Sequence, residues 1–152
     1  LFNKDGGHDL IAQAISRDWE RALGVKVRLV QKETKVFSSD LKAGRFMVSR
    51  ASWFGDYGDA TTFLDINRTG NGNNWTGWGS PEYDRLLDEA AVTADAAGRL
   101  TLLQQAETIL LREMPGAPLN FRSRTYLLDP TVKNWVSAPL GIRRYQLLRL
   151  SN

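Results

Sequence analysis

The first part of the chain passes from a helical to a strand-like pattern of apolar residues. Across residues 9–23 the apolar positions fall on one stripe with a period of about 3.6 residues, which predicts an amphipathic helix. Gly24 follows this stripe, at the place where a glycine commonly ends a helix. Apolar residues then occupy every second position over residues 25–29, as in a half-buried strand. With a strand end at residues 1–2, this order predicts a β-α-β unit.

The next part of the chain leads into a long loop. A short helix is predicted over residues 39–43 and a second strand over residues 46–51. Residues 52–79 are then rich in glycine, asparagine and tryptophan. A loop of this length is usually functional or disordered, and its aromatic residues favour an ordered, functional loop.

Two helices are predicted after this loop. Ser80, Pro81 and Glu82 form a typical helix start, with a capping hydroxyl, a proline in the first turn and an acidic residue. Asp95 can cap a second helix that ends before Pro115, so we expect an antiparallel pair. The remaining pattern predicts short strands at residues 117–121, 126–128 and 145–150. The chain is therefore expected to have an α/β fold.

Composition excludes several classes of protein. With 152 residues, of which 42% are hydrophobic and 24% charged, the chain is long and apolar enough to fold. The net charge of +3 comes without a long basic run, so we expect no nucleic-acid partner. The absence of cysteine excludes disulfides and thiolate metal sites. No apolar stretch approaches the roughly 18 residues of a membrane span.

The candidate chemistry lies in the stretch RASWFGDYGDATTFLD, residues 50–65. Asp56 and Asp59 could form the carboxylate pair of a glycoside hydrolase, although each follows a glycine, as aspartates in turns do. The only histidine, His8, lies at a helix start, where a solvated or capping role is expected. The sequence has no nucleophile elbow, phosphate loop or dinucleotide motif. We therefore expect no catalytic residue, no metal site and no cofactor.

Ligand binding is the alternative role for this stretch. A carboxylate among apolar rings loses water and needs a cationic or hydrogen-bonding partner to remain charged. The ammonium group of a ligand could be that partner of Asp56, and tryptophan faces also attract cations. In the structural alternative, Trp53 and Phe54 pack beneath the loop and Asp56 accepts backbone hydrogen bonds. The residues alone leave both alternatives open.

Several motifs along the whole chain resemble those of one family. They include the W-x-G-D-x-x-D loop at Trp53–Asp59, N-N-x-T-G-W at Asn73–Trp78 and S-P-E-Y-D-x-L-L-D-E-A at Ser80–Ala90. The segment A-E-x-x-L followed by P-x-x-P-L completes the set. In this combination, the chain is similar to the extracellular solute-binding proteins of oligopeptide and dipeptide ABC importers, solute-binding protein family 5.

The resemblance implies one lobe of a two-lobed periplasmic binding protein of type II-like fold, with a mixed β-sheet flanked by helices. Because family members are much longer, and because this chain begins without methionine, we expect a fragment of a longer chain. Residues 1–125 would form most of the C-terminal ligand-binding lobe. Residues 126–152 would form a tail that returns toward the missing N-terminal lobe.

The resemblance also implies a function and a site. The protein would capture oligopeptides or dipeptides in a cleft between the lobes, and it would not be an enzyme. Asp56 matches the aspartate that pairs with the peptide α-ammonium, and Trp53 and Phe54 match the adjacent cleft wall, with Tyr57 beside them. Arg50 matches an arginine that can meet negative charge on the peptide.

The expected partners are a peptide ligand, the membrane permease subunits of the importer and the missing N-terminal lobe. The expected location is periplasmic or extracellular, with a lipid anchor at the missing N-terminus as one form. Some relatives bind oligosaccharides or metal chelates on the same scaffold, which is the alternative for this chain. A glycoside hydrolase using Asp56 and Asp59 is the less favoured alternative.

Overall fold

Helices dominate the chain, and each strand has only two residues. The computed structural model describes residues 1–4, 6–121, 123, 125–136, 140–141 and 144–151. The helices are α1 (His8–Leu23), α2 (Thr34–Lys42), α3 (Thr61–Leu64), α4 (Pro81–Val92) and α5 (Ala96–Glu113), with 3-10 turns η1 (Asp65–Asn67) and η2 (Tyr145–Leu147). The strands are β1 (Phe2–Asn3), β2 (Gln31–Lys32), β3 (Val132–Lys133) and β4 (Arg149–Leu150).

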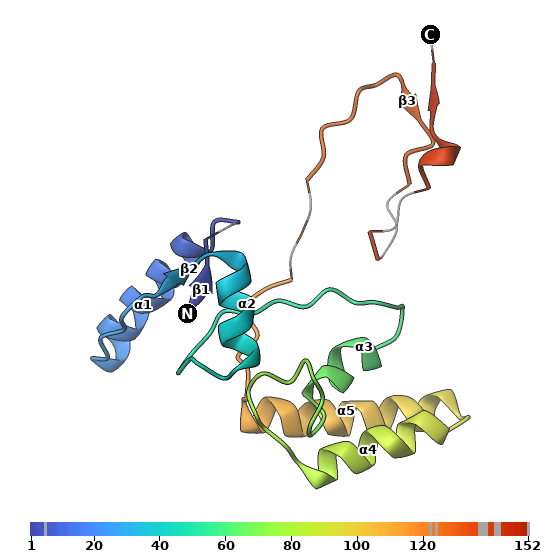
Figure 1. Cartoon of the computed structure of the whole chain (residues 1–152). Helices are drawn as coiled ribbons and strands as arrows, with labels where there is room; N and C mark the ends of the chain where they lie inside the picture. Colours follow the sequence, from blue (N-terminus) through green and yellow to red (C-terminus); the bar gives the residue numbers. More distant parts are fainter. Residues whose placement is uncertain (5, 122, 124, 137–139, 142–143, 152) are drawn as a thin grey trace.

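The predicted β-α-β unit is confirmed at the start of the chain. Strands β1 and β2 are parallel, with Phe2 beside Gln31, and α1 forms the connection between them (Figure 1). Gly24 ends α1 in the left-handed conformation, with φ 67°, which glycine adopts without strain. The order of elements and the glycine stop were both visible in the sequence.

Some predicted bounds in this region are wrong. The strand expected over residues 25–29 is displaced, because β2 covers only the two residues that lie beside β1. The helix expected over residues 39–43 begins earlier, at Thr34, where the carboxylate of Glu33 accepts hydrogen bonds from the first turn of α2. Glutamate is not among the residues that usually cap a helix, so this start gave no clear signal.

A third extended segment lies beside β1. The amino group of Leu1 donates to the carbonyl oxygen of Val48 at 2.8 Å, and the backbone N–H of Arg50 donates to the carbonyl oxygen of Leu1 at 3.0 Å. Neighbouring parallel strands alternate in this way. Residues 46–51 are not a regular strand, but Val48 and Arg50 in the predicted strand pair with Leu1, directly before β1.

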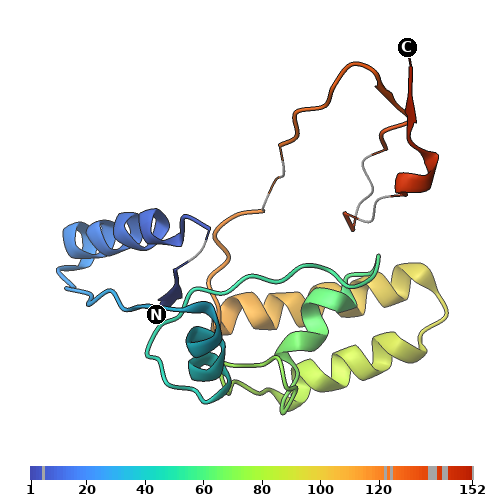
Figure 2. The same cartoon turned by 45° about the horizontal axis from the view of Figure 1, so that its top comes forward.

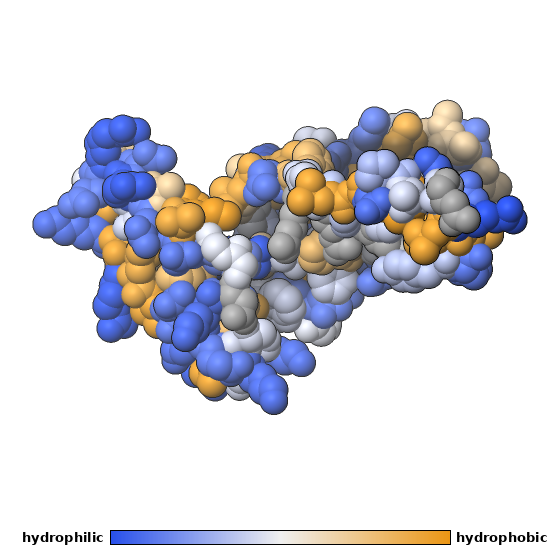
Figure 3. Space-filling view, turned by 90° about the horizontal axis from the view of Figure 1, so that it is seen from above, coloured by the Kyte–Doolittle hydropathy of each residue, from blue (hydrophilic) through white to orange (hydrophobic). Residues whose placement is uncertain are grey.

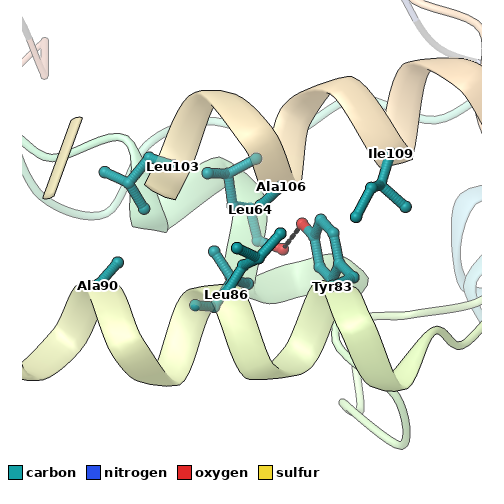
Figure 4. Packing of buried hydrophobic residues seen from close by; sticks show 8 residues of the cluster. Leu64, Tyr83, Leu86, Ala90, Leu103, Ala106 and Ile109 are labelled. Atoms are coloured by element: carbon teal, nitrogen blue, oxygen red, sulfur yellow. Dashed lines mark hydrogen bonds between the residues drawn. The ribbon is translucent and has the colours of Figure 1, made fainter. Parts of the chain in front are cut away.

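The main core lies between α4 and α5, which form the predicted antiparallel pair (Figures 1 and 4). Ser80 accepts a hydrogen bond from the N–H of Tyr83 at the start of α4, and Asp95 accepts one from Gly98 at the start of α5. Both predicted caps are confirmed. The core contains residues from α3, α4 and α5: Leu64, Tyr83, Leu86, Leu87, Ala90, Leu103, Ala106 and Ile109.

The long loop at residues 52–79 is partly helical, because α3 and η1 lie within it. Its later part is held by the side-chain amide of Asn74, which donates to the carbonyl oxygens of Asn67, Arg68 and Trp78. The indole of Trp78 then reaches α5, where it donates to Glu113 at 2.8 Å. The loop is therefore ordered against the helical pair, as its aromatic content suggested.

The last part of the chain departs most from expectation. Among the described residues, no strand is found at 117–121 or 126–128, and the segment expected as a strand at 145–150 contains η2 followed by β4. Strand β4 is antiparallel to β3, with Val132 beside Leu150. In both cartoon views this hairpin stands apart from the helices, at the end of an extended stretch (Figures 1 and 2).

Much apolar surface is uncovered. Leu10 and Leu23, which belong to the predicted stripe of α1, are exposed, as are Phe121 and Leu127 in the extended stretch. Figure 3 shows hydrophobic surface at several places on one face. Within the described residues, no helix combines the length and the apolar character that a membrane crossing requires.

Candidate functional site

The candidate site begins where the segment beside β1 ends. Arg50 is the last residue of this segment to pair with Leu1, and the chain then leaves the parallel strands. In open α/β folds, ligands bind outside the carboxyl ends of parallel strands. The loop of residues 51–60, which holds the other predicted binding residues, therefore leaves the strands at the end where such folds bind ligands.

The loop is attached to the first turn of α3. The backbone N–H of Asp56 donates to the hydroxyl oxygen of Thr62 at 2.9 Å, and Thr62 is buried. Gly55 lies tightly against the same turn, because a Cβ atom there would be 3.2 Å from both the Thr62 methyl group and the Phe63 ring. The backbone of Asp56 is thus fixed by one hydrogen bond and by close packing of the preceding residue.

The carboxylate of Asp59 is held by other residues of the chain. Its carboxylate accepts two hydrogen bonds from the guanidinium of Arg99, both at 2.9 Å, in a bidentate ion pair. It also accepts from the N–H and the hydroxyl of Thr61 at 2.9 and 2.8 Å. The hydrogen bonds from Arg99 and then those from Thr61 hold the pKa of Asp59 far below its usual range. Asp59 has a structural role at the start of α3, as turn chemistry predicted.

Asp56 is in the opposite situation. Its side chain is exposed, and its carboxylate has no hydrogen bond or ion pair within the part of the chain that the structure describes. The two aspartates, only three residues apart, therefore differ in what they can do. Asp59 has its oxygens occupied, whereas Asp56 can accept a cation from outside the chain.

Aromatic residues precede and follow Asp56 in the sequence. Phe54 and Tyr57 are 51% and 45% exposed. The hydroxyl of Tyr57 lies 3.2 Å from that of Thr61 and donates to Asp65 at 3.4 Å, so its ring is tied to α3 and η1. Trp53 is half-buried, and its indole N–H has no hydrogen-bond partner among the described residues. The loop thus offers partly exposed rings and one unpaired donor.

Two sequence-based views of this region change. Asp56 is not desolvated within this chain, since it is exposed, so a dry environment would need a further surface over the loop. His8 is neither solvated nor a cap, because Gly7 occupies the capping position and His8 is buried as the first residue of α1.

No group of three or more histidine, cysteine or carboxylate side chains that could hold a metal ion is found among the described residues.

Sequence reasoning missed the partners that hold the loop. Arg99 lies 40 positions after Asp59 and belongs to α5. Nothing in the local pattern around Arg99 distinguishes it from an ordinary solvated helix residue, so no sequence signal could have found this pair. Thr62 follows the loop directly, but its buried hydroxyl is recognisable as an acceptor for Asp56 only in the folded chain.

Comparison with known proteins agrees with this fold. No family model matches the chain. The dipeptide-binding protein DppE of Bacillus subtilis is 40% identical over 134 residues, and the oligopeptide-binding protein OppA of the same species is 37% identical over 141 residues. These matches cover 88% and 92% of this chain. A probable deoxycholate-binding periplasmic protein of Escherichia coli, YgiS, is 37% identical over 87% of this chain.

A solved structure, OppA of Burkholderia pseudomallei, aligns with 99% of this chain at a TM-score of 0.90 and 30% identity. The chain spans about a quarter of the length of the three relatives, at 25–26%, and 30% of that structure. These relatives are binding proteins and not enzymes, which agrees with the prediction that the protein is not an enzyme. The chain is therefore homologous, in sequence and in fold, to one segment of the oligopeptide- and dipeptide-binding proteins of solute-binding protein family 5.

Proposed function

We propose that this chain is part of the substrate-binding component of an ABC importer, and that Asp56 pairs with the α-ammonium of a bound peptide. The observation that carries the proposal is the contrast between the two aspartates. Asp59 is occupied by Arg99, whereas the carboxylate of Asp56 is exposed and unpaired among the described residues. A fixed backbone with a free carboxylate suits recognition of a ligand cation.

Peptide capture would require a second surface. An exposed carboxylate binds an ammonium weakly in water, because the Coulomb energy is reduced by the high dielectric constant. Closure of a second lobe over residues 53–57 would exclude water and strengthen the pair. In this mechanism Trp53, Phe54 and Tyr57 form one wall of the closed cleft, and Arg50 faces negative charge on the peptide.

The same proposal assigns each part of the chain to a lobe of the binding protein. Residues 1–125 form part of the C-terminal lobe, and residues 126–152 form a tail toward an N-terminal lobe. The extended stretch and the separate β3–β4 hairpin support this division (Figure 1). Of the tail, residues 137–139, 142–143 and 152 lie outside the described residues. The protein would deliver peptide to permease subunits in the periplasm or outside the cell, with a lipid anchor as one form of attachment.

The alternatives receive less support. A glycoside hydrolase of the usual kind needs one of its two carboxyl groups as a proton donor. Asp59 cannot be that donor, because its ion pair keeps it ionised at neutral pH. It is also poorly suited to be the base or nucleophile, because Arg99 and Thr61 already hold its oxygens. Oligosaccharides or metal chelates would not need a free carboxylate opposite an ammonium. One relative is named a probable deoxycholate-binding protein, and a fold by itself does not fix the class of ligand.

The test compares peptide binding by the wild-type protein and Asp56→Asn in the complete binding protein that contains these residues. A tripeptide library with free amino termini is equilibrated with each protein, and retained peptide is quantified. We expect Asp56→Asn to weaken binding by roughly 2–5 kcal/mol, the scale for truncating one partner of a buried charge pair. Equal binding by the two proteins would refute the role of Asp56.

A further inference from the structure

Arg99 is connected to the proposed ammonium site by a short chain of contacts. Its guanidinium holds both carboxylate oxygens of Asp59, and the same carboxylate accepts two hydrogen bonds from Thr61. The next residue, Thr62, donates its N–H to the carbonyl oxygen of Asp59 at 3.2 Å and accepts the N–H of Asp56 at 2.9 Å. Each step is a direct hydrogen bond or a peptide bond.

These contacts close the loop between Asp56 and Asp59 onto α3, and Arg99 then fastens it to α5. The two helices also pack directly, and Leu64 of α3 lies in the core with α4 and α5. Without Arg99, Asp59 would keep only the contacts to Thr61, and its carboxylate could turn toward solvent. The Asp56 side chain would then lose part of the framework that sets its position.

We infer that Arg99 is a positioning residue for ligand binding: through Asp59 it fixes the loop that presents Asp56, and it thereby sets the preference for a free amino terminus. This inference rests on the proposed function of Asp56. Binding constellations need side chains held to within about 0.5 Å of their productive geometry, and a bidentate arginine is well suited to that constraint.

The surroundings of the pair distinguish positioning from a role in stability alone. The side chains of Arg99 and Asp59 are 32% and 35% exposed, and partly exposed ion pairs contribute only modestly to the free energy of unfolding. Arg99 therefore contributes more to the position of the loop than to the free energy of unfolding. Loss of Arg99 should therefore change ligand selectivity without a large change in folding.

The test uses the complete binding protein and two probes. One is a tripeptide library with free amino termini, and the other is the same library acetylated at the amino termini. If wild-type protein prefers the free form by about 100-fold, Asp56→Asn should remove that preference and Arg99→Gln should reduce it about tenfold. Arg99→Lys keeps the charge but cannot bind in the bidentate form, so an intermediate preference is expected.

Two controls separate positioning from general damage. Arg85→Gln removes an exposed ion pair with Glu89 on α4 and should leave the preference at the wild-type value. In the Asp56→Asn background, Arg99→Gln should have no further effect on the affinity for the library with free amino termini, because the two residues act through one contact. An additional loss of affinity in that background would show that Arg99 acts elsewhere, and it would overturn the inference.

The outcomes for the inference and for the proposed function are distinct. If Asp56→Asn loses the preference while Arg99→Gln retains the wild-type value, the inference is wrong and the proposed function stands. If Asp56→Asn retains the preference, or if the wild-type protein binds neither library, both are wrong. Should circular dichroism show that Arg99→Gln is unfolded, Arg99→Lys decides, and a preference equal to that of the wild-type protein overturns the inference.

Discussion

The phenol of Tyr83 donates a 2.6 Å hydrogen bond to the carbonyl oxygen of Leu64, inside the core (Figure 4). Tyr83 is on α4 and Leu64 ends α3, so this bond joins the helical pair to the segment that follows the loop of residues 51–60. Burial raises the pKa of the Tyr83 hydroxyl well above its usual range, which keeps it a donor at all ordinary pH values.

Replacement of this tyrosine should destabilise the protein. Tyr83→Phe leaves the buried carbonyl oxygen of Leu64 without its partner, which costs about 1–3 kcal/mol of unfolding free energy. The matched control is Tyr57→Phe, whose hydroxyl is exposed and makes longer contacts of 3.2 and 3.4 Å. The control should change the free energy by less than about 0.5 kcal/mol. Urea unfolding followed by circular dichroism measures both, and equal effects would contradict the role of the buried bond.

A second prediction concerns the packing of the loop of residues 51–60 against α3. A methyl group at Gly55 would be 3.2 Å from Thr62 and Phe63, so Gly55→Ala requires these side chains to move and should cost about 1 kcal/mol. Nothing lies within 4 Å of the corresponding position at Gly58. Gly58→Ala should therefore be neutral or slightly stabilising, by up to about 1 kcal/mol. A loss of stability in Gly58→Ala as large as that in Gly55→Ala would show that packing is not the cause.

A third prediction follows from the low pKa of Asp59. The folded state lowers this pKa below the usual value of 3.8, so the ionised carboxylate stabilises the folded state above that value. This stabilisation is lost as the pH falls through the lower, folded-state pKa. The difference in urea midpoint between wild-type protein and Asp59→Asn should therefore be largest near neutral pH and should shrink below about pH 4. A difference that stays constant down to the lowest pH would contradict the ion pair with Arg99.

A fourth prediction tests where the core lies. Leu87 is 1% exposed between α4 and α5, and Leu87→Ala should cost about 2–5 kcal/mol through the cavity that it leaves. Leu100 on α5 is 54% exposed and is the control. Leu100→Ala should change the free energy of unfolding by less than about 0.5 kcal/mol. A large effect at Leu100 would mean that another surface covers it in solution.

The sequence predicted the helices with local start and stop signals. Ser80 and Asp95 cap α4 and α5, and Gly24 ends α1, because each acts on backbone groups only a few residues away. The start of α2 was missed because Glu33 is an uncommon cap. These successes and this failure all depend on interactions within one helical turn.

The strands and the site partners depend on distant residues. An extended segment becomes a strand only where another backbone pairs with it, so the alternation at residues 25–29 could not show that pairing is confined to Gln31–Lys32. The same limit applies to Asp59 and Arg99. The sequence singled out Asp56 by resemblance, whereas the pairing that occupies Asp59 became visible only when α5 was placed beside α3.

The α4–α5 pair and the β-α-β unit differ in how far apart their partners are along the chain. Tyr83 and Ile109 meet across a short connection, whereas Leu1 must find Val48, 47 positions away. Contacts between near neighbours require less loop closure and form faster. The helical pair should thus be the first part to gain protection from hydrogen exchange during refolding, and the β-α-β unit with the segment that carries Arg50 should follow it. The loop of residues 51–60, which connects the two, would then be completed last.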